Sequence, residues 1–210
     1  MDIKKVELIF ERFKQSNPIP KIELNYVNRF TLLIAIVLSA RTTDVSVNKI
    51  TKELFNIVDT PDKMLNLGQD KLKKHISSIG LYNSKAKNVI ELSKILIEKY
   101  SSKVPTDFDD LISLPGVGRK SANVFLNSVL GMKTIAVDTH VFRVSNRIGL
   151  VEEKNVLKTE QSLLRIIPDK YLLYAHHWLV LHGRYICKAQ KPMCGQCIIS
   201  NLCEFTNKLL

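Results

Sequence analysis

The chain has 210 residues, enough for one domain or two small ones with a buried core. Hydrophobic residues make up 45% and aromatic residues 7%, a balance that excludes an intrinsically disordered chain. The formal net charge is +11, from 31 Lys and Arg against 20 Asp and Glu, which fits either a Lys-rich solvated surface or a protein that binds a polyanion such as nucleic acid.

The start of the chain and its apolar runs predict where the protein is found. The opening Met1-Asp2-Ile3-Lys4-Lys5 has an early acidic residue and leads into no apolar signal-peptide core. The longest apolar run, residues 32–38, is far too short to cross a bilayer. We therefore predict a cytosolic protein without membrane contact.

Apolar periodicity predicts helices along almost the whole chain. The first helix carries an apolar stripe through Phe10 and ends at the proline-containing segment 17–20. Segment 30–40 is apolar nearly all round, which predicts a buried helix. Four further helices are predicted by their caps and apolar stripes: one that begins at a cap at Asp44, one that runs from Thr60-Pro61 to Gly68, one with the stripe Leu72, Ile76 and Ile79 that ends at Gly80, and one that runs from a cap at Asn83 to about Tyr100. A capping box at Thr106 and Asp109 predicts the start of another. The same signals predict helices over residues 139–147, 156–167 and 171–181.

These patterns predict an all-α fold. No stretch combines sustained alternation of apolar and polar residues with a hairpin turn, so no strand is expected. The chain also has no internal repeat and no low-complexity linker. Composition by itself marks no domain boundary.

A turn with two glycines, Leu114-Pro115-Gly116-Val117-Gly118-Arg119-Lys120-Ser121-Ala122, joins two predicted apolar helices. The glycines allow a hairpin too tight for side chains, and the N–H groups that open the second helix face outward with the positive end of its dipole. We predict that Gly116, Val117, Gly118 and Arg119 bind a phosphate of a nucleic-acid backbone without reading bases. The alternative is a plain helix–turn–helix corner.

Lys120, on the second helix of this hairpin, has two interpretations. As one more basic residue at a phosphate site, it only neutralises charge. As a nucleophile, it is an amine kept partly neutral by desolvation or by a neighbouring cation such as Arg119, and it forms a Schiff base with a sugar carbon. The second interpretation makes Lys120 the candidate catalytic residue.

Asp138, in the segment Ala136-Val137-Asp138-Thr139-His140-Val141, stands directly before a predicted helix. Its position favours an N-cap, a role that aspartate fills often. A carboxylate at a helix start in a cleft can also offset positive charge on a sugar or take a proton from an attacking group. Both roles are compatible, so Asp138 is the second candidate catalytic residue.

All four cysteines, Cys187, Cys194, Cys197 and Cys203, lie close together near the C-terminus with the spacing C-x6-C-x2-C-x5-C. In a chain without a secretion signal, such a cluster predicts a metal site rather than disulfides. Structural zinc sites usually combine two close pairs, and here only Cys194 and Cys197 form one. A compact loop of four thiolates suits a 4Fe-4S cluster better, although its chemistry also permits zinc.

Other polar residues lie near the cysteines. The histidines His176, His177 and His182 are expected to pack or to lie at the surface rather than to bind the metal, since four thiolates are present. Lys188 and Lys191 lie between the first two cysteines. They are predicted to contact a second phosphate on a loop that the metal holds rigid; the alternative is an ordinary solvated loop.

Together these motifs resemble the endonuclease III family of helix–hairpin–helix iron–sulfur DNA glycosylases. The resemblance runs through nearly the whole chain and includes residues 38–40, 43–49, 79–86 and 182–185. Its most specific parts are Leu-Pro-Gly-Val-Gly-Arg-Lys, Val-Asp-Thr-His and the cysteine spacing. It implies one 4Fe-4S cluster on the four cysteines.

The resemblance also implies two helical domains with a DNA-binding cleft between them. Residues 22–132 are expected to form a six-helix barrel with the helix–hairpin–helix motif at about 107–130. Residues 1–21 and 133–210 are expected to form the iron–sulfur cluster domain, with the cluster loop at 187–203. Lys120 is then expected to face Asp138 across the cleft.

The implied activity is that of a bifunctional DNA glycosylase and AP lyase of base excision repair that removes oxidised pyrimidines. Lys120 is expected to attack C1′ of a flipped nucleotide with the help of Asp138, and the Schiff base allows β-elimination 3′ to the abasic site. The expected partner is double-stranded DNA with a damaged base or an abasic site. The protein is expected to bind this DNA as a monomer. It is expected to lie in the bacterial cytosol, associated with the nucleoid through DNA.

Two side chains are expected to enter the duplex. Leu81 matches the family's leucine wedge, an apolar insertion that kinks DNA; without the resemblance, a core position after Gly80 is favoured. Arg41 stands where the family usually has a glutamine that fills the hole left by the flipped base. The contact with the unpaired base is therefore expected to differ in this chain.

Two other functions fit the motifs. An adenine-mismatch glycosylase shares the hairpin and the cluster, but it generally lacks a lysine at the position of Lys120 and has a further C-terminal domain, which we do not expect here because the chain ends seven residues after Cys203. A non-catalytic DNA-binding module would use the hairpin as a phosphate clamp and the metal as a structural element. Covalent trapping by borohydride separates an enzyme from such a module.

Overall fold

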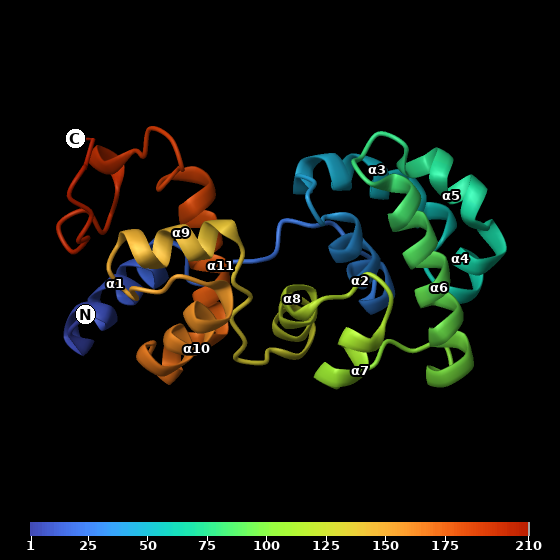
Figure 1. Ribbon diagram of the computed structural model, residues 1–210, viewed down its shortest axis with the longest axis horizontal. Coiled ribbons are helices and arrows are strands. Elements are labelled where there is room, and N and C mark those ends of the chain that lie inside the picture. The colour runs from blue at the N-terminus through green and yellow to red at the C-terminus, as the bar shows by residue number, and fades with distance from the viewer. Residues whose placement is uncertain (210) are drawn as a thin grey trace. The chain divides into compact units, whose positions relative to one another are not determined.

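The computed structural model describes residues 1–209, which form eleven α-helices and one short 3-10 helix (Figure 1). This described part of the chain contains no β-strand, so the all-α prediction is confirmed. The chain divides into two compact units, which we call unit 1 (Met1–Ile22 with Gly131–Leu210) and unit 2 (Glu23–Leu130).

Unit 2, all of whose residues the structure describes, contains seven helices. They are α2 (Arg29–Leu38), α3 (Asp44–Ile57), α4 (Pro61–Leu67), α5 (Gln69–Ile76), α6 (Tyr82–Tyr100), α7 (Phe108–Ser113) and α8 (Arg119–Leu130). In agreement with its apolar sequence, α2 is buried from Phe30 to Leu38, and it packs on α3, α6 and α8. It has only 10 residues, and no helix within residues 1–209 is long and apolar enough to cross a membrane.

Two helix caps of unit 2 differ from the sequence prediction. Helix α3 is capped by Thr43, whose hydroxyl accepts from the N–H of Ser46, and not by Asp44. Helix α7 is capped by Asp107, whose Oδ1 accepts from two backbone N–H groups, and not by a capping box of Thr106 and Asp109. In both cases a neighbouring residue offers an equally good oxygen, and only the backbone geometry decides which one is used.

The connection from α5 to α6 also differs from the prediction. Helix α5 ends at Ile76, three residues before the buried Ile79 that the apolar stripe placed in the helix. Helix α6 begins after Leu81, so the expected cap Asn83 lies inside the helix. The helix starts early because Leu81 takes a left-handed conformation that turns the chain directly into α6.

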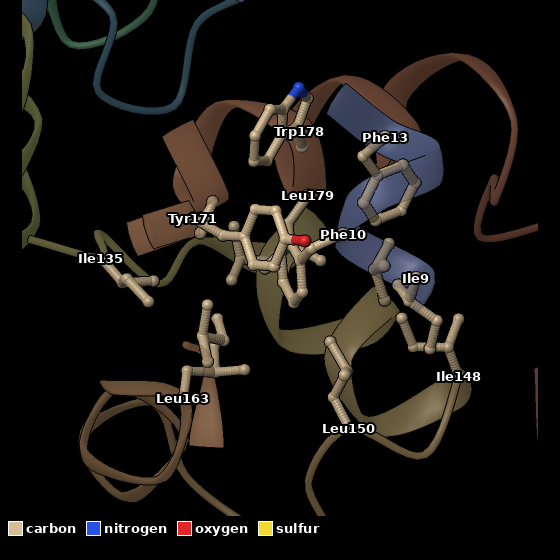
Figure 2. Close-up of a cluster of buried hydrophobic side chains, with 14 of the residues drawn as sticks. Ile9, Phe10, Phe13, Ile135, Ile148, Leu150, Leu163, Tyr171, Trp178 and Leu179 are labelled. Atoms are coloured by element: carbon tan, nitrogen blue, oxygen red, sulfur yellow. The ribbon is translucent and has the colours of Figure 1, made fainter. Parts of the chain in front are cut away.

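Unit 1 combines α1 (Ile3–Ser16) with α9 (Thr139–Arg147), α10 (Val156–Ile166), α11 (Asp169–Tyr185) and the 3-10 helix η1 (Cys194–Gln196). Figure 2 shows Phe10 of α1 inside the core of this unit, with its ring 5.8 Å from that of Tyr171 and 6.2 Å from that of Trp178. The indole N–H of Trp178 donates to the carbonyl of Asn17 at 2.8 Å and so holds the end of α1. Helix α11 is longer than the predicted segment 171–181, and its extension to Tyr185 buries His182 and Gly183.

Candidate functional site

The glycine-containing turn forms a tight hairpin between α7 and α8. The N–H of Val117 donates to the carbonyl of Leu114 at 3.0 Å and closes the turn. The carbonyl of Gly118 accepts from the N–H of Ala122 at 3.0 Å, so α8 begins immediately after the turn. The first N–H groups of a helix have no partner within it, and here they follow Gly118, which has no side chain to cover them. The hairpin thus has the geometry of an anion site.

The two glycines of the hairpin serve different needs. Gly116 has a φ of +81°, and a Cβ there would lie 3.0 Å from Nδ2 of Asn88 and 3.2 Å from Cγ1 of Val37. Gly118 has no such φ, and a Cβ there would meet nothing within 4 Å. The crowding expected at both glycines therefore occurs only at Gly116. Gly118 leaves open space in front of the start of α8, where a phosphate can approach the backbone.

Lys120 is the second residue of α8, and its side chain is exposed. The preceding residue, Arg119, holds its guanidinium 5.1 Å from the ring centroid of Phe108, a cation–π contact with α7. Both positive charges stand at the helix end whose dipole is also positive, an arrangement that favours a bound anion. Lys120 is thus an accessible amine in the first turn of α8, next in sequence to Arg119, and its role as a nucleophile stays a prediction.

Asp138 is the N-cap of α9, as its position in the sequence predicts. Its Oδ1 accepts from the N–H of His140 at 2.9 Å and from that of Val141 at 2.8 Å. Within residues 1–209, the other carboxylate oxygen has no hydrogen-bond partner. One oxygen thus stabilises the helix while the other is available for chemistry. Asp138 belongs to unit 1 and Lys120 to unit 2, and their joint action stays a prediction.

Arg41 and Leu81 both adopt the left-handed conformation that bulky residues rarely take. Arg41 has a φ of +54° in a turn closed by the N–H of Thr42, which donates to the carbonyl of Ser39 at 3.0 Å. Leu81 has a φ of +60° and is 57% exposed, so the alternative of a core leucine is wrong. Each such residue costs about 1–2 kcal/mol, and strain of this kind is concentrated at functional sites.

The cluster loop is held by two arginines of α9. The guanidinium of Arg143 donates to the carbonyls of Gly183 at 2.8 Å and of Cys187 at 3.2 Å. Arg147 donates to the carbonyl of Lys188 at 2.7 Å, and the same nitrogen lies 3.7 Å from Sγ of Cys187. The guanidinium carbon of Arg147 also lies 4.7 Å from the ring centroid of Phe205, a cation–π contact. These contacts fix the chain where it leaves α11 and enters the loop.

The four cysteines line one pocket with about 320 Å³ of empty space, part of it open to solvent. All four are free thiols. No three thiol, imidazole or carboxylate groups in residues 1–209 converge as ligands of a single ion. A cubane of four irons binds each thiolate to its own iron, so four thiols spaced around an open volume fit this cofactor.

Burial and charge act in opposite directions on these thiols. Burial raises the pKa of Cys187, which the hydrogen bond and the charge of Arg147 lower in part. Burial also raises the pKa of Cys197. A thiol of this kind is deprotonated when it binds a metal, and the cationic guanidinium beside it then offsets the thiolate charge.

The three histidines of α11 are buried, which excludes the surface position. Burial lowers the pKa of His177 and of His182 to about 4, so both are neutral at pH 7. The ring of His182 lies 5.1 Å from that of Phe13, and its Nε2 is 3.7 Å from Sγ of Cys197. His182 therefore packs beside the cluster loop, in agreement with the expectation that the histidines are packing groups.

Lys188 and Lys191 are exposed on the loop between Cys187 and Cys194. The backbone at Lys188 is held by Arg147, whose guanidinium binds its carbonyl. Lys191 has a φ of +48°, another left-handed residue that is not glycine. The loop thus presents two lysines from a constrained backbone, and their contact with phosphate stays a prediction.

Three positively charged residues that the structure places at these sites were not predicted from the sequence. Arg143 and Arg147 are four residues apart and so lie on one face of α9, a spacing that was visible but had no evident partner. Lys85 lies in the segment 79–86 that resembles the family, but nothing in the sequence assigned its side chain a role. It is 4% exposed, and its Nζ donates to Oγ1 of Thr42 at 2.8 Å.

Comparison with known proteins identifies the family. Residues 34–169 match the HhH-GPD superfamily of base excision DNA repair proteins, and residues 187–203 match the iron–sulfur binding domain of endonuclease III. Endonuclease III of Rickettsia felis is 59% identical over 99% of this chain and 97% of its own length. This chain belongs to the endonuclease III family.

Other members and a solved structure agree. Endonuclease III of Escherichia coli (strain K12) is 51% identical over 98% of this chain and 97% of its own. The structure of a trapped endonuclease III–DNA covalent intermediate matches with a TM-score of 0.91 and 43% identity, covering 97% of this chain and 96% of that chain. The predicted family and fold are therefore confirmed.

Membership of this family establishes the activity and the cofactor of the chain. The chain is a base excision repair enzyme, a DNA glycosylase and AP lyase for oxidised pyrimidines. Its cofactor is a 4Fe-4S cluster, which the endonuclease III iron–sulfur domain at residues 187–203 binds. This finding decides against zinc. When bound, the cluster would cross-link four thiolates and so hold rigid the loop that carries Lys188 and Lys191.

Removing one cluster ligand is expected to destroy the loop. Protein purified aerobically should be yellow-brown with about four iron atoms per chain, whereas Cys194→Ser should be colourless or insoluble, because ligand loss undoes the fold of a metal-dependent loop. Iron analysis and absorbance measure the result. The control is Gln196→Ala, an exposed residue between two cysteines, which should keep its iron. One zinc and no iron in the wild type would contradict the prediction.

Proposed function

We propose that Lys120 is the nucleophile and that Asp138 acts with it on one flipped nucleotide. The observation that carries this proposal is the exposed amine of Lys120 directly behind the open face of Gly118, in a chain of the endonuclease III family. A phosphate bound at the hairpin would anchor the strand beside this amine. The target nucleotide must leave the stack because C1′ is shielded within the duplex.

The proposed chemistry runs in two stages. In the first, Nζ of Lys120 forms a bond to C1′ as the bond from C1′ to the damaged base breaks, and the base leaves with the electron pair of that bond. The free oxygen of Asp138 offsets the positive charge that develops on the sugar and then takes the proton that the amine loses. In the second, O4′ takes a proton as the sugar ring opens to a Schiff base, a proton leaves C2′, and the C3′–O bond breaks with departure of the phosphate on the 3′ side. Water then hydrolyses the Schiff base, which frees Lys120 and leaves an unsaturated aldehyde on the 5′ side of the break.

We propose that the remaining predicted residues bind the DNA backbone and the gap in the duplex. Gly116, Val117, Gly118 and Arg119 bind one phosphate at the hairpin, and Lys188 and Lys191 bind a second. Leu81 is the apolar wedge, since its exposed side chain is displayed by a strained helix start. Arg41 meets the base that has lost its partner.

The test of the proposed function is borohydride trapping on a duplex with one oxidised pyrimidine, such as 5-hydroxyuracil. A covalent adduct at Lys120, located by peptide mass spectrometry, supports the proposal. Binding without an adduct would show that excision does not pass through a lysine Schiff base, and an adduct at another lysine would overturn the assignment of Lys120. The same preparation, passed through size-exclusion chromatography with light scattering, tests the proposed monomer. We also propose that the enzyme works in the bacterial cytosol.

The proposed role of Arg41 predicts a preference for the opposite base. An arginine side chain only donates hydrogen bonds, and its planar fork fits the two acceptors O6 and N7 of guanine better than the edge of adenine, which combines a donor and an acceptor. A glutamine both donates and accepts, so it can adapt to either base. We expect the wild type to favour lesions opposite guanine, and Arg41→Gln to reduce that preference. A bidentate pair contributes about 1–3 kcal/mol of discrimination in a groove, so a change of a few fold is expected at a wet gap.

Single-turnover rates for one lesion opposite each of the four bases measure this preference. Lys49→Gln, an exposed change on α3 of unit 2, removes the same charge and should leave the ranking unchanged. An unchanged ranking in Arg41→Gln, with a shallower salt dependence of binding, would show that Arg41 contacts a phosphate and reads no base.

A further inference from the structure

Lys85 is a buried cation whose position is unfavourable for stability. Its residue is 4% exposed, and burial lowers the pKa of its ammonium group. It is the fourth residue of α6, close to the helix end where the dipole repels positive charge. Its hydrogen-bond partner is the neutral hydroxyl of Thr42, at 2.8 Å from Nζ. An ammonium held in this way costs stability, so a gain in stability does not explain its presence.

The contacts of Lys85 reach both left-handed residues of the proposed DNA contact. Its backbone N–H donates to the carbonyl of Leu81 at 3.0 Å, the first hydrogen bond of α6. Its side chain holds Thr42, the residue after Arg41 and the last of the turn that Ser39 closes. One lysine therefore connects two strained segments that are 40 residues apart in the sequence.

The same helix also supports the hairpin. Asn88, one turn after Lys85, is the side chain that a Cβ at Gly116 would meet at 3.0 Å. The first two turns of α6 thus touch the Arg41 turn, the Leu81 start and the Gly116 hairpin, all within unit 2. Side chains that enter a duplex must be held before DNA arrives, because ordering them on binding would weaken the complex.

We propose that Lys85 is a positioning residue that holds the turn of Arg41 against the start of α6, so that Arg41 and Leu81 are presented together to the gap in the duplex. This inference rests on the proposed roles of Arg41 and Leu81. Loss of this charge-assisted hydrogen bond should reduce single-turnover cleavage of a lesion duplex by about 10- to 100-fold.

The test compares two variants that each remove this hydrogen bond. Lys85→Met keeps an unbranched buried stem and Thr42→Val keeps the shape of the side chain, whereas Thr42→Ser keeps the hydroxyl and should restore function. We expect both of the first two variants to lose duplex cleavage and the double variant to be no worse than either. The control Lys87→Met changes an exposed lysine on the same helix, paired with Glu91 at 3.8 Å, and should act as the wild type does.

Two further measurements separate positioning from folding and from catalysis. A duplex with a stable abasic analogue and 2-aminopurine opposite it reports insertion by fluorescence, without any chemistry. Trapping on a single-stranded abasic oligonucleotide needs the nucleophile but has no opposite strand to enter. Lys85→Met and Thr42→Val should lose the fluorescence change and keep single-strand trapping, with unchanged iron content and near-UV circular dichroism.

The outcomes are distinguishable. If the wild type traps neither substrate, the proposed function fails, while the fluorescence experiment still tests Lys85. If Thr42→Val behaves as the wild type and only Lys85→Met weakens binding, with a shallower salt dependence, Lys85 contributes charge to a phosphate and the proposal is overturned. Multiplied losses in the double variant, or a full fluorescence change in both single variants, would overturn it as well.

Discussion

Lys120→Gln is expected to abolish covalent trapping and to reduce single-turnover strand cleavage by at least about 10³-fold. An amide nitrogen forms no Schiff base. The covalent intermediate between residue 120 and the sugar is therefore lost, and both base excision through the lysine and β-elimination depend on it. Binding should be nearly unchanged, because the hairpin holds phosphate through backbone N–H groups and the variant removes a single cation. Trapping gels, single-turnover assays and binding to an uncleavable abasic duplex measure the three quantities.

The control for this variant is Lys94→Gln. Lys94 lies on α6 with its side chain 62% exposed and forms an ion pair with Glu98 at 3.7 Å, and its replacement removes the same charge by the same chemistry. We expect full trapping and full cleavage in this protein. Retained trapping in Lys120→Gln, at the level of Lys94→Gln, would show that another amine is the nucleophile.

Asp138→Asn is expected to fold normally and to lose about 10²- to 10⁴-fold in turnover, the range for a general acid or base. Asparagine caps helices as well as aspartate does, and its side-chain oxygen can accept from the N–H groups of His140 and Val141 in the same way. The variant removes the charge and the proton acceptor at the second oxygen. Thermal unfolding and single-turnover rates at saturating enzyme measure the two effects separately.

Asn155→Ala is the matched control, because it removes a helix cap without changing a residue of the proposed chemistry. Asn155 caps α10 in the same unit by accepting from the N–H of Lys158 at 2.9 Å. Removing this cap should lower the free energy of unfolding by about 1 kcal/mol and leave turnover unchanged. If Asp138→Asn instead resembles Asn155→Ala, with a lower melting temperature and a wild-type rate, Asp138 is a cap only.

Local sequence patterns determined most of the helices. Helix α2 is buried where its sequence is apolar all round, and α9 begins directly after Asp138 as its cap position predicted. The four cysteines indicated a metal site from their spacing alone. These features depend on residues within a few positions of one another, so periodicity and capping chemistry are sufficient to predict them.

Helix ends and backbone strain were decided by the tertiary structure. Asn83 was the better cap by residue type, yet α6 begins after Leu81, a leucine in a left-handed conformation. No local preference predicts such a leucine, because its strain is offset by contacts elsewhere in the fold. The crowding at Gly116 has the same origin, since it comes from side chains of α2 and α6 and not from the turn.

The proposed roles of Lys120 and Asp138 come from motifs and family resemblance, whereas the residues that support the candidate sites come from the structure. Lys85 binds Thr42 across 43 positions, and Arg147 binds the carbonyl of Lys188 across 41. The sequence shows that these residues are charged, but it does not show which groups they bind. A lysine or an arginine has a long, flexible side chain that accepts many partners, and only the packing of the helices brings one oxygen within reach.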